Sequence, residues 1–137
     1  MRAAVRAQLP WLPPVGVVWH VEAGVDFDAV RTPRTLGLRI IATLGSECGA
    51  VICDPWTRIH YFLVAPGATG GWRLPQTVAC GRATYIVVPP LGASEPSLHW
   101  TVEPSAARVH TNVDRLRRTV QHVLNTHWRE DRDHHAE

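Results

Sequence analysis

The sequence predicts an α+β domain: a mainly antiparallel sheet, with one helix after the first strands and a C-terminal helix packed on it. Two stretches predict the sheet, because RIHYFLVAPG (58–67) and GRATYIVVPP (81–90) are apolar and aromatic runs that end in proline, as strands followed by a stop signal do. Apolar residues that recur with helical spacing predict helices over 33–44 and 112–127. A length of 137 residues suits one domain.

The chain before the first helix is expected to hold an irregular arm and strand material. Residues 1–14 are interpreted as the arm, because prolines at 13 and 14 interrupt it, and a single α+β domain is expected over 15–128. The stretch GVDFDAVRTP (24–33) alternates apolar and acidic residues. This period of two is typical of a half-buried strand.

The first helix is predicted to run to Leu44. Thr32 suits the N-cap and Pro33 suits the first helical position. Gly45 suits the stop that follows the last turn. The residues of the apolar face are Leu36, Ile40, Ile41 and Leu44.

The sheet is predicted to use four strands, at 49–53, 59–65, 83–88 and 98–102. The turn DPWTR (54–58) joins the first two as a hairpin, since Asp and Pro stand in an order that turns favour. PGATGGW (66–72) is rich in glycine, but a phosphate-binding loop normally also has a lysine and a following helix. The chain has no lysine and a strand signal follows, so this stretch is interpreted as a connection.

The C-terminal helix is predicted to begin after Thr111, a suitable N-cap with Asp114 three residues later. Its apolar stripe consists of Val113, Leu116, Val120, Val123 and Leu124. Residues 129–137 (REDRDHHAE) are interpreted as a charged, flexible tail.

Composition limits the classes of function. The formal net charge is +2 and every basic residue is arginine, a balance too weak to indicate nucleic-acid binding by itself. Three cysteines are an odd number, which argues against a disulfide framework. No stretch approaches the roughly 18 apolar residues of a membrane span. We therefore expect a cytoplasmic protein with no membrane partner, in which the six tryptophans are mainly core anchors and some serve a partner surface.

Asp26 and Asp28 form the first candidate site. If both lie on one strand face, their Cβ atoms are roughly 7 Å apart, and such a pair can hold a divalent metal for phosphoryl transfer. The alternative is an exposed strand face before a turn.

His60 is the second candidate, because it interrupts an otherwise apolar strand face. It is either a ligand-binding residue or a structural histidine whose polar atoms are satisfied inside the fold. The third candidate is a stripe on the last helix, which could bind phosphate or an acidic partner or could be an ordinary solvated face. Its residues are Arg115, Arg118, His122 and Arg129.

The order of these stretches over about 24–104 resembles the primase/polymerase domain of archaeo-eukaryotic primase type. Members of that family carry a His-aromatic strand, then a glycine-bearing strand that ends in prolines, then an aromatic-Trp strand. The corresponding stretches here are His60-Tyr61-Phe62, GRATYIVVPP (81–90) and His99-Trp100. The stretch VDFDAVRTPRTLG also resembles a segment of small relatives from high-GC bacteria.

This resemblance implies roles for particular residues. Asp26 and Asp28 would stand at the metal-binding carboxylate pair, and His60, with Arg58 and Arg82, at the nucleotide-phosphate site. The third metal-binding carboxylate of the family is missing, since Val78 stands near its position and no acid occurs between residues 54 and 95. A two-metal site needs converging carboxylates, so the pair is interpreted as vestigial.

The resemblance therefore implies a non-catalytic accessory or regulatory protein of DNA replication that binds a protein or nucleic-acid partner and needs no cofactor. Two alternatives stay open. One is a metal-dependent nucleotidyl-transfer enzyme with Mg²⁺ or Mn²⁺ as cofactor. The other is a structural protein that forms homo-oligomers.

Overall fold

The fold is α+β, as predicted. The computed structural model describes residues 2–135, with side chains for residues 4–126. In chain order the elements are α1 (Arg2–Gln8), β1 (Trp19–Glu22), β2 (Asp28–Pro33), α2 (Arg34–Leu44), the 3-10 turn η1 (Gly45–Glu47), β3 (Val51–Asp54), β4 (Ile59–Val64), β5 (Val78–Cys80), β6 (Tyr85–Val88), β7 (His99–Val102) and α3 (Val113–His135).

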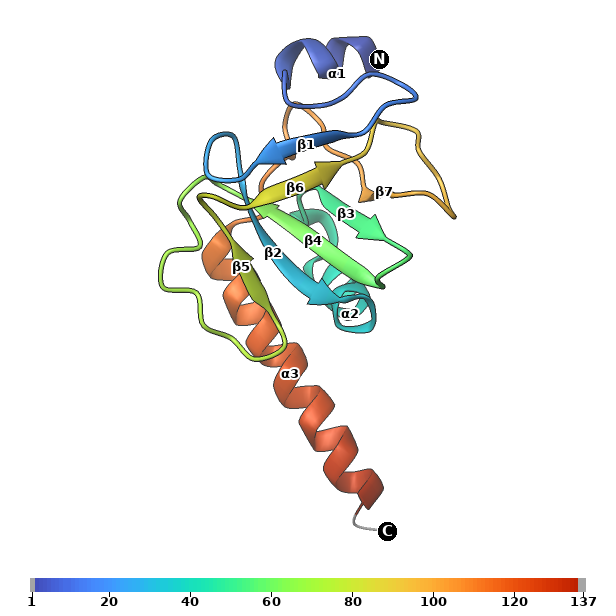
Figure 1. The fold of residues 1–137 in the computed structure, drawn as a ribbon. Helices are drawn as coiled ribbons and strands as arrows, with labels where there is room; N and C mark the ends of the chain where they lie inside the picture. Colours follow the sequence, from blue (N-terminus) through green and yellow to red (C-terminus); the bar gives the residue numbers. More distant parts are fainter. Residues whose placement is uncertain (1, 136–137) are drawn as a thin grey trace.

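The strands form two antiparallel sheets (Figure 1). The larger sheet has the strand order β5-β2-β4-β3-β7, and β1 and β6 form a separate two-stranded ribbon. β4 is the central strand of the larger sheet, while β5 and β7 are its edges. The order of the strands therefore brings β2 and β5, which are distant in sequence, together at one edge.

Two apolar clusters hold the layers together, because successive strand residues point to opposite faces. On one face, strand residues such as Val30 and Phe62 pack with Ile40 of α2 and Leu116 of α3. On the other face, residues that include Leu63 and Ile52 pack with the ribbon and with Trp11 and Leu12 of the N-terminal segment. The larger sheet thus lies between the two helices and the ribbon.

The N-terminal segment differs from the predicted irregular arm. Residues 2–8 (RAAVRAQ) form α1, because alanine, arginine and glutamine are good helix formers. Beyond the helix, Trp11 and Leu12 are buried in the core, so this segment belongs to the domain. At the other end, α3 continues to His135, past residue 129 where the tail was predicted to begin, since no glycine or proline interrupts it.

The predicted strand over 24–33 is shorter in the structure. Gly24 adopts φ +93° in a turn, and β2 begins only at Asp28. Asp26 lies in the bend before it. The two carboxylates therefore do not share a strand face as the alternating pattern predicted.

Both predicted helix N-caps were wrong. The predicted stop of α2 at Gly45 is correct, since Gly45 has φ 55° and its N–H donates a hydrogen bond to the Ile41 carbonyl. Thr32 belongs to β2, and α2 has no side-chain cap. Thr111 is buried, and its Oγ1 accepts a hydrogen bond from the Gly49 N–H at 2.9 Å. The Thr111 hydroxyl thus binds the segment before β3, and the cap of α3 is provided by the next residue, Asn112.

Asn112 provides the N-terminal cap of α3, since its Oδ1 accepts a hydrogen bond from the Arg115 N–H at 3.0 Å. We predict that Asn112→Ala lowers the free energy of unfolding by about 1 kcal/mol, the usual effect of losing such a cap. Urea unfolding measures this change. The control is Asn125→Ala at an exposed position of the same helix. Equal effects of the two substitutions would contradict the capping role.

Candidate functional site

His60 lies in the interior, beneath α2. It is on β4 with its side chain 1% exposed, and it pairs with Thr32 of β2 and Cys53 of β3. α2 approaches so closely that a Cβ atom added at Gly37 would lie 2.9 Å from His60 Cβ. The backbone of α2 therefore covers the imidazole, and a ligand has no route to it without displacing the helix.

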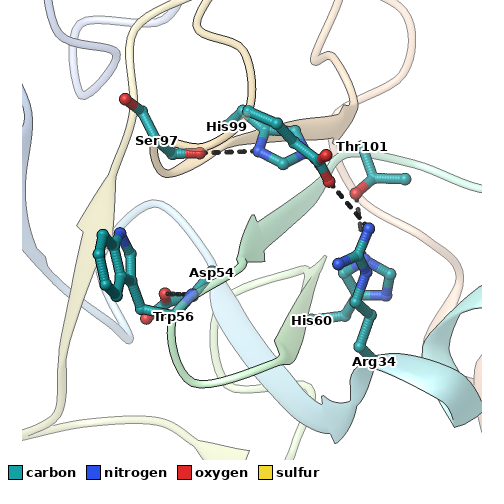
Figure 2. Close-up of polar contacts among 8 residues, drawn as sticks. Arg34, Asp54, Trp56, His60, Ser97, His99 and Thr101 are labelled. Atoms are coloured by element: carbon teal, nitrogen blue, oxygen red, sulfur yellow. Dashed lines mark hydrogen bonds and ion pairs between the residues drawn. The ribbon is translucent and has the colours of Figure 1, made fainter.

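The imidazole of His60 is only half satisfied. Its Nε2 lies 3.1 Å from the hydroxyl of Thr101 on β7, while Nδ1 is buried without a hydrogen-bond partner (Figure 2). Thr32 Oγ1, on the neighbouring strand, is also buried without a partner. A buried polar atom that makes no hydrogen bond is destabilising. The structure therefore supports the interpretation of His60 as a structural residue that is imperfectly paired.

The pKa of His60 is lowered from 6.5 to about 4, chiefly by burial and also by the positive charge of Arg34 and by the neighbouring His99. The ring is consequently neutral at neutral pH. A neutral, covered imidazole cannot act as a cationic partner for phosphate. The phosphate-binding role that the family resemblance implied for His60 is not supported by this geometry.

Polar contacts around His60 join α2 to the loop before β7. Arg34, the first residue of α2, forms an ion pair with Glu95 at 2.8 Å. His99 Nδ1 lies 2.8 Å from the Ser97 carbonyl oxygen. In Figure 2, Arg34 lies beside His60, below Thr101 and His99. These contacts link elements that are far apart in sequence, so a structural role explains the cluster.

The predicted carboxylate pair has separate surroundings. Asp28 is 2% exposed, and its Oδ2 accepts hydrogen bonds from Thr69 N–H at 3.2 Å and Thr69 Oγ1 at 2.6 Å. Asp26 contributes its carbonyl oxygen to a hydrogen bond from His110 Nε2 at 2.9 Å. Within the described side chains, no three His, Cys, Asp or Glu residues gather as metal ligands would. Asp28 therefore anchors the glycine-rich loop.

Arginines gather instead on the elements at the β5 edge. Arg31 on β2 and Arg58 in the turn before β4 both line a surface depression of about 290 Å³, together with Gln76 and Val78. Arg58 and Gln76 have positive φ angles of 60° and 63°. Non-glycine residues in this conformation are strained, and such strain is frequent at ligand sites. The depression thus brings together two arginines from different strands and turns.

Two more exposed arginines belong to the same edge. Arg73 lies in the loop that leads to β5, and Arg82 lies two residues after the end of β5. We call these two, with Arg31 and Arg58, the β5-edge arginines. Among residues 4–126, none of the four forms an ion pair with an acidic side chain.

The predicted stripe on α3 is less available. Arg115 forms an ion pair with Glu47 at 2.9 Å. Arg118 and His122 are exposed. Arg129 lies outside the described side chains. Among the described side chains of this stripe, Arg118 is thus the arginine that forms no ion pair.

Trp56 is an exposed aromatic residue close to Arg58 in sequence. Its side chain is 84% exposed at the tip of the β3–β4 hairpin. Asp54 Oδ1 accepts hydrogen bonds from the Trp56 and Thr57 N–H groups at 3.0 and 3.4 Å, so the turn that carries the indole is fixed. Trp56 is therefore a candidate for the partner surface that the tryptophan content suggested, and that role stays a prediction.

Sequence reasoning did not select Arg31, although one signal was present. Arg31 follows Ala29 and Val30 in β2, and the register places it opposite Tyr61, on the sheet face away from His60. The period of two in a strand would have identified it as a residue on the opposite face from Thr32. Its proximity to Arg58 depends on the strand order.

Comparisons with protein-family models, with curated proteins and with solved structures gave no match. Among the described helices, none combines the length and the apolar character needed to cross a membrane.

The contact between α2 and His60 predicts the effect of Gly37→Ala. The added Cβ would overlap the imidazole, and overpacking of this kind lowers the free energy of unfolding by about 1–3 kcal/mol. Gly70→Ala is the matched control, because its Cβ would meet only the Gly67 carbonyl oxygen at 3.6 Å. Urea unfolding of both variants tests the contact, and equal stabilities would show that α2 does not lie against His60.

The lowered pKa predicts how stability depends on pH. Since the unfolded chain protonates His60 near pH 6.5 and the folded chain only near pH 4, the stabilisation is complete above pH 6.5 and is lost as the pH falls towards 4. The loss amounts to at most about 3 kcal/mol. His60→Leu should remove this part of the pH profile, as measured by urea unfolding from neutral to mildly acidic pH. An unchanged profile would mean that the ring is protonated freely in the folded state.

Proposed function

We propose that this protein is a non-catalytic accessory protein that binds single-stranded nucleic acid through the β5 edge of a primase/polymerase-like sheet. The observation that carries the proposal is the placement of the four β5-edge arginines. They are exposed, and none is neutralised by an acid within the described side chains. Arginine forks bind phosphate groups in a bidentate manner.

The weak net charge does not oppose this proposal, because the charges are unevenly distributed. The ion pairs join Arg34 to Glu95, Arg115 to Glu47 and Arg117 to Asp114. Three acidic side chains are therefore balanced by arginines outside the β5 edge. A local excess of positive charge raises the concentration of an anionic partner at that surface even when the net charge is small.

Trp56 supports a single-stranded partner. Unpaired bases stack on exposed aromatic side chains, and this stacking tolerates any base because every base has a π face. The indole is exposed and its turn is fixed by Asp54. Stacking of a base on Trp56 would accompany neutralisation of phosphates by the exposed Arg58 and Arg31.

The surroundings of Asp28 support a non-catalytic role. Two-metal nucleotidyl transfer needs carboxylates that converge on ions about 4 Å apart. Asp28 instead accepts two hydrogen bonds from Thr69, and Asp26 lies in the preceding bend. On this basis we propose that the protein binds nucleic acid and does not catalyse a reaction on it.

The test is fluorescence anisotropy of a labelled oligodeoxythymidine of about 20 nucleotides, longer than one domain of this size covers. We expect binding that weakens as salt rises. The double variant Arg31→Ala/Arg58→Ala should bind more weakly and lower the salt slope by about 1.4, because each lost phosphate contact lowers it by about 0.7. Trp56→Ala should weaken binding and leave the slope nearly unchanged.

Arg118→Ala is the matched control, since it removes an exposed arginine from α3, and we expect it to bind as the wild type does. If the protein does not bind the oligodeoxythymidine even at low salt, the proposal is wrong. Extension of a primed template by the purified protein with Mg²⁺ or Mn²⁺ would replace it with the enzymatic alternative.

A further inference from the structure

Strand β1 of the ribbon lies at the margin of the domain. Its partner β6 is well covered, since Ile86 and Val88 on the inner face of the ribbon are 3% and 0% exposed. On β1, Trp19 and Val21 occupy the same face opposite them, yet Trp19 is 36% exposed and Val21 is half-buried. The inner face of β1 is therefore incompletely covered within one copy of the chain.

The hydrogen bonds of the ribbon show which main-chain groups of β1 point away from it. The Ala23 N–H donates to the Thr84 carbonyl oxygen at 2.8 Å, so Ala23 directs its main-chain groups towards β6. These directions alternate along an antiparallel strand, so the groups of His20 and Glu22 point away from β6. Neither residue makes a further backbone hydrogen bond within the described structure. Each therefore presents an unpaired N–H and C=O at the edge.

Little on β1 protects this edge from pairing with another strand. Proline, a β-bulge or inserted charges blunt most edge strands. The sequence of β1, WHVE, contains no proline, and its register with β6 is regular from end to end. The exposed polar side chains are His20 and Glu22. Their order decides which partner strand the edge accepts.

We propose that β1 pairs antiparallel with β1 of a second copy of this chain, about a twofold axis at Val21. In this register His20 of each copy lies opposite Glu22 of the other. Each such pair exchanges both of its N–H···O bonds, so the main-chain groups that are unpaired in one copy are satisfied in the dimer. On the outer face, the imidazole donates an N–H to the carboxylate opposite it.

Other registers of the same two strands fit less well. A shift by one residue would place the outward main-chain groups of one strand opposite groups that already bond to β6. A shift by two residues would place Glu22 opposite Glu22, or His20 opposite His20, and like charges directly opposite each other are destabilising. The directions of the hydrogen-bonding groups and the order of the polar side chains thus select the register centred on Val21.

Apolar side chains beside β1 supply surface that the dimer would bury. Val15, Val17 and Val18, in the segment before β1, are 80%, 43% and 47% exposed, and they line a hollow of about 340 Å³ together with Leu91. Antiparallel pairing brings this segment of one copy beside the turn after β1 of the other, which carries the exposed Val25. Exposed apolar patches of this kind mark interaction surfaces, and a twofold contact is the commonest one in homo-oligomers.

The oligomeric state tests the proposal, measured by sedimentation velocity of the full chain over a range of concentrations. No nucleic acid is added, so the result does not depend on the proposed function. We expect a concentration-dependent monomer–dimer equilibrium, because a strand of four residues makes a small interface. A chain that remains monomeric up to about 1 mM would overturn the proposal, and so would a trimer, because a twofold contact closes with two copies.

An exchange of charge tests the register. His20→Glu places glutamates opposite each other in both symmetry-related pairs, and we expect it to weaken the dimer at least about tenfold. The double variant His20→Glu/Glu22→Arg restores opposite charges and should restore the dimer. Within one copy these positions lie beside the uncharged Val87 and Tyr85, so the fold should be little affected. His122→Glu on the exposed face of α3 is the matched control, and failure of the double variant to recover would refute this register.

Cysteine cross-linking tests the position of the axis. Val21→Cys places two cysteines opposite each other with Cα atoms about 4.5 Å apart, a separation that a disulfide spans. The control Val18→Cys is more exposed, but its two cysteines would lie roughly 20 Å apart along the paired strands. The native cysteines are buried, so they contribute little background. We expect a disulfide-linked dimer of Val21→Cys under mild oxidation. Equal cross-linking of the two variants, or none at concentrations where the wild type is dimeric, would show that the strands do not pair about Val21.

Discussion

The close approach of α2 to β4 is the constraint on which the functional surface depends. Gly37 lets the backbone of the helix lie against the imidazole of His60, so that α2 covers the face of the central strand on which His60 lies. His60 and Thr32 then face the helices, and the next pair in the register, Tyr61 and Arg31, faces the other way. His60, which stands out in the sequence of its strand, is therefore enclosed and structural. Arg31, which does not stand out, is exposed and can meet a partner.

The sequence predicted those elements whose local periodicity is strong. The strand over 59–65 and the helix that ends at Gly45 were predicted nearly to the residue, because apolar spacing and stop residues are local signals. The caps were mispredicted, since Thr111 has a tertiary role with Gly49. The strand over 24–33 failed at Gly24, where a turn with positive φ interrupts an alternating pattern. Apolar and polar residues can alternate with a period of two in a turn as well as in a strand. The alternation alone therefore did not show where β2 begins.

The candidate site was harder to predict, because a strand pattern indicates which residues share a face and not what covers that face. His60 stood out as polar, yet only the position of α2 shows that it is enclosed. Arg31 and Arg58 line one depression although they are distant in sequence, and only the pairing of β2 with β4 brings them together. Which residues are enclosed and which lie side by side depends on the order of the strands and the arrangement of the layers. The local sequence pattern of one strand does not contain either.

The loop between β4 and β5 is held at two points. Asp28 fixes Thr69 in its first half. Trp72 is buried, donates a hydrogen bond to Thr77 Oγ1 at 2.8 Å, and lies 5.5 Å beneath the guanidinium of Arg117. A loop fixed in this way loses little conformational entropy when a ligand arrives. Association at this edge should therefore resemble the docking of a rigid surface, with an encounter rate set by charge and ionic strength rather than by slow rearrangement of the chain.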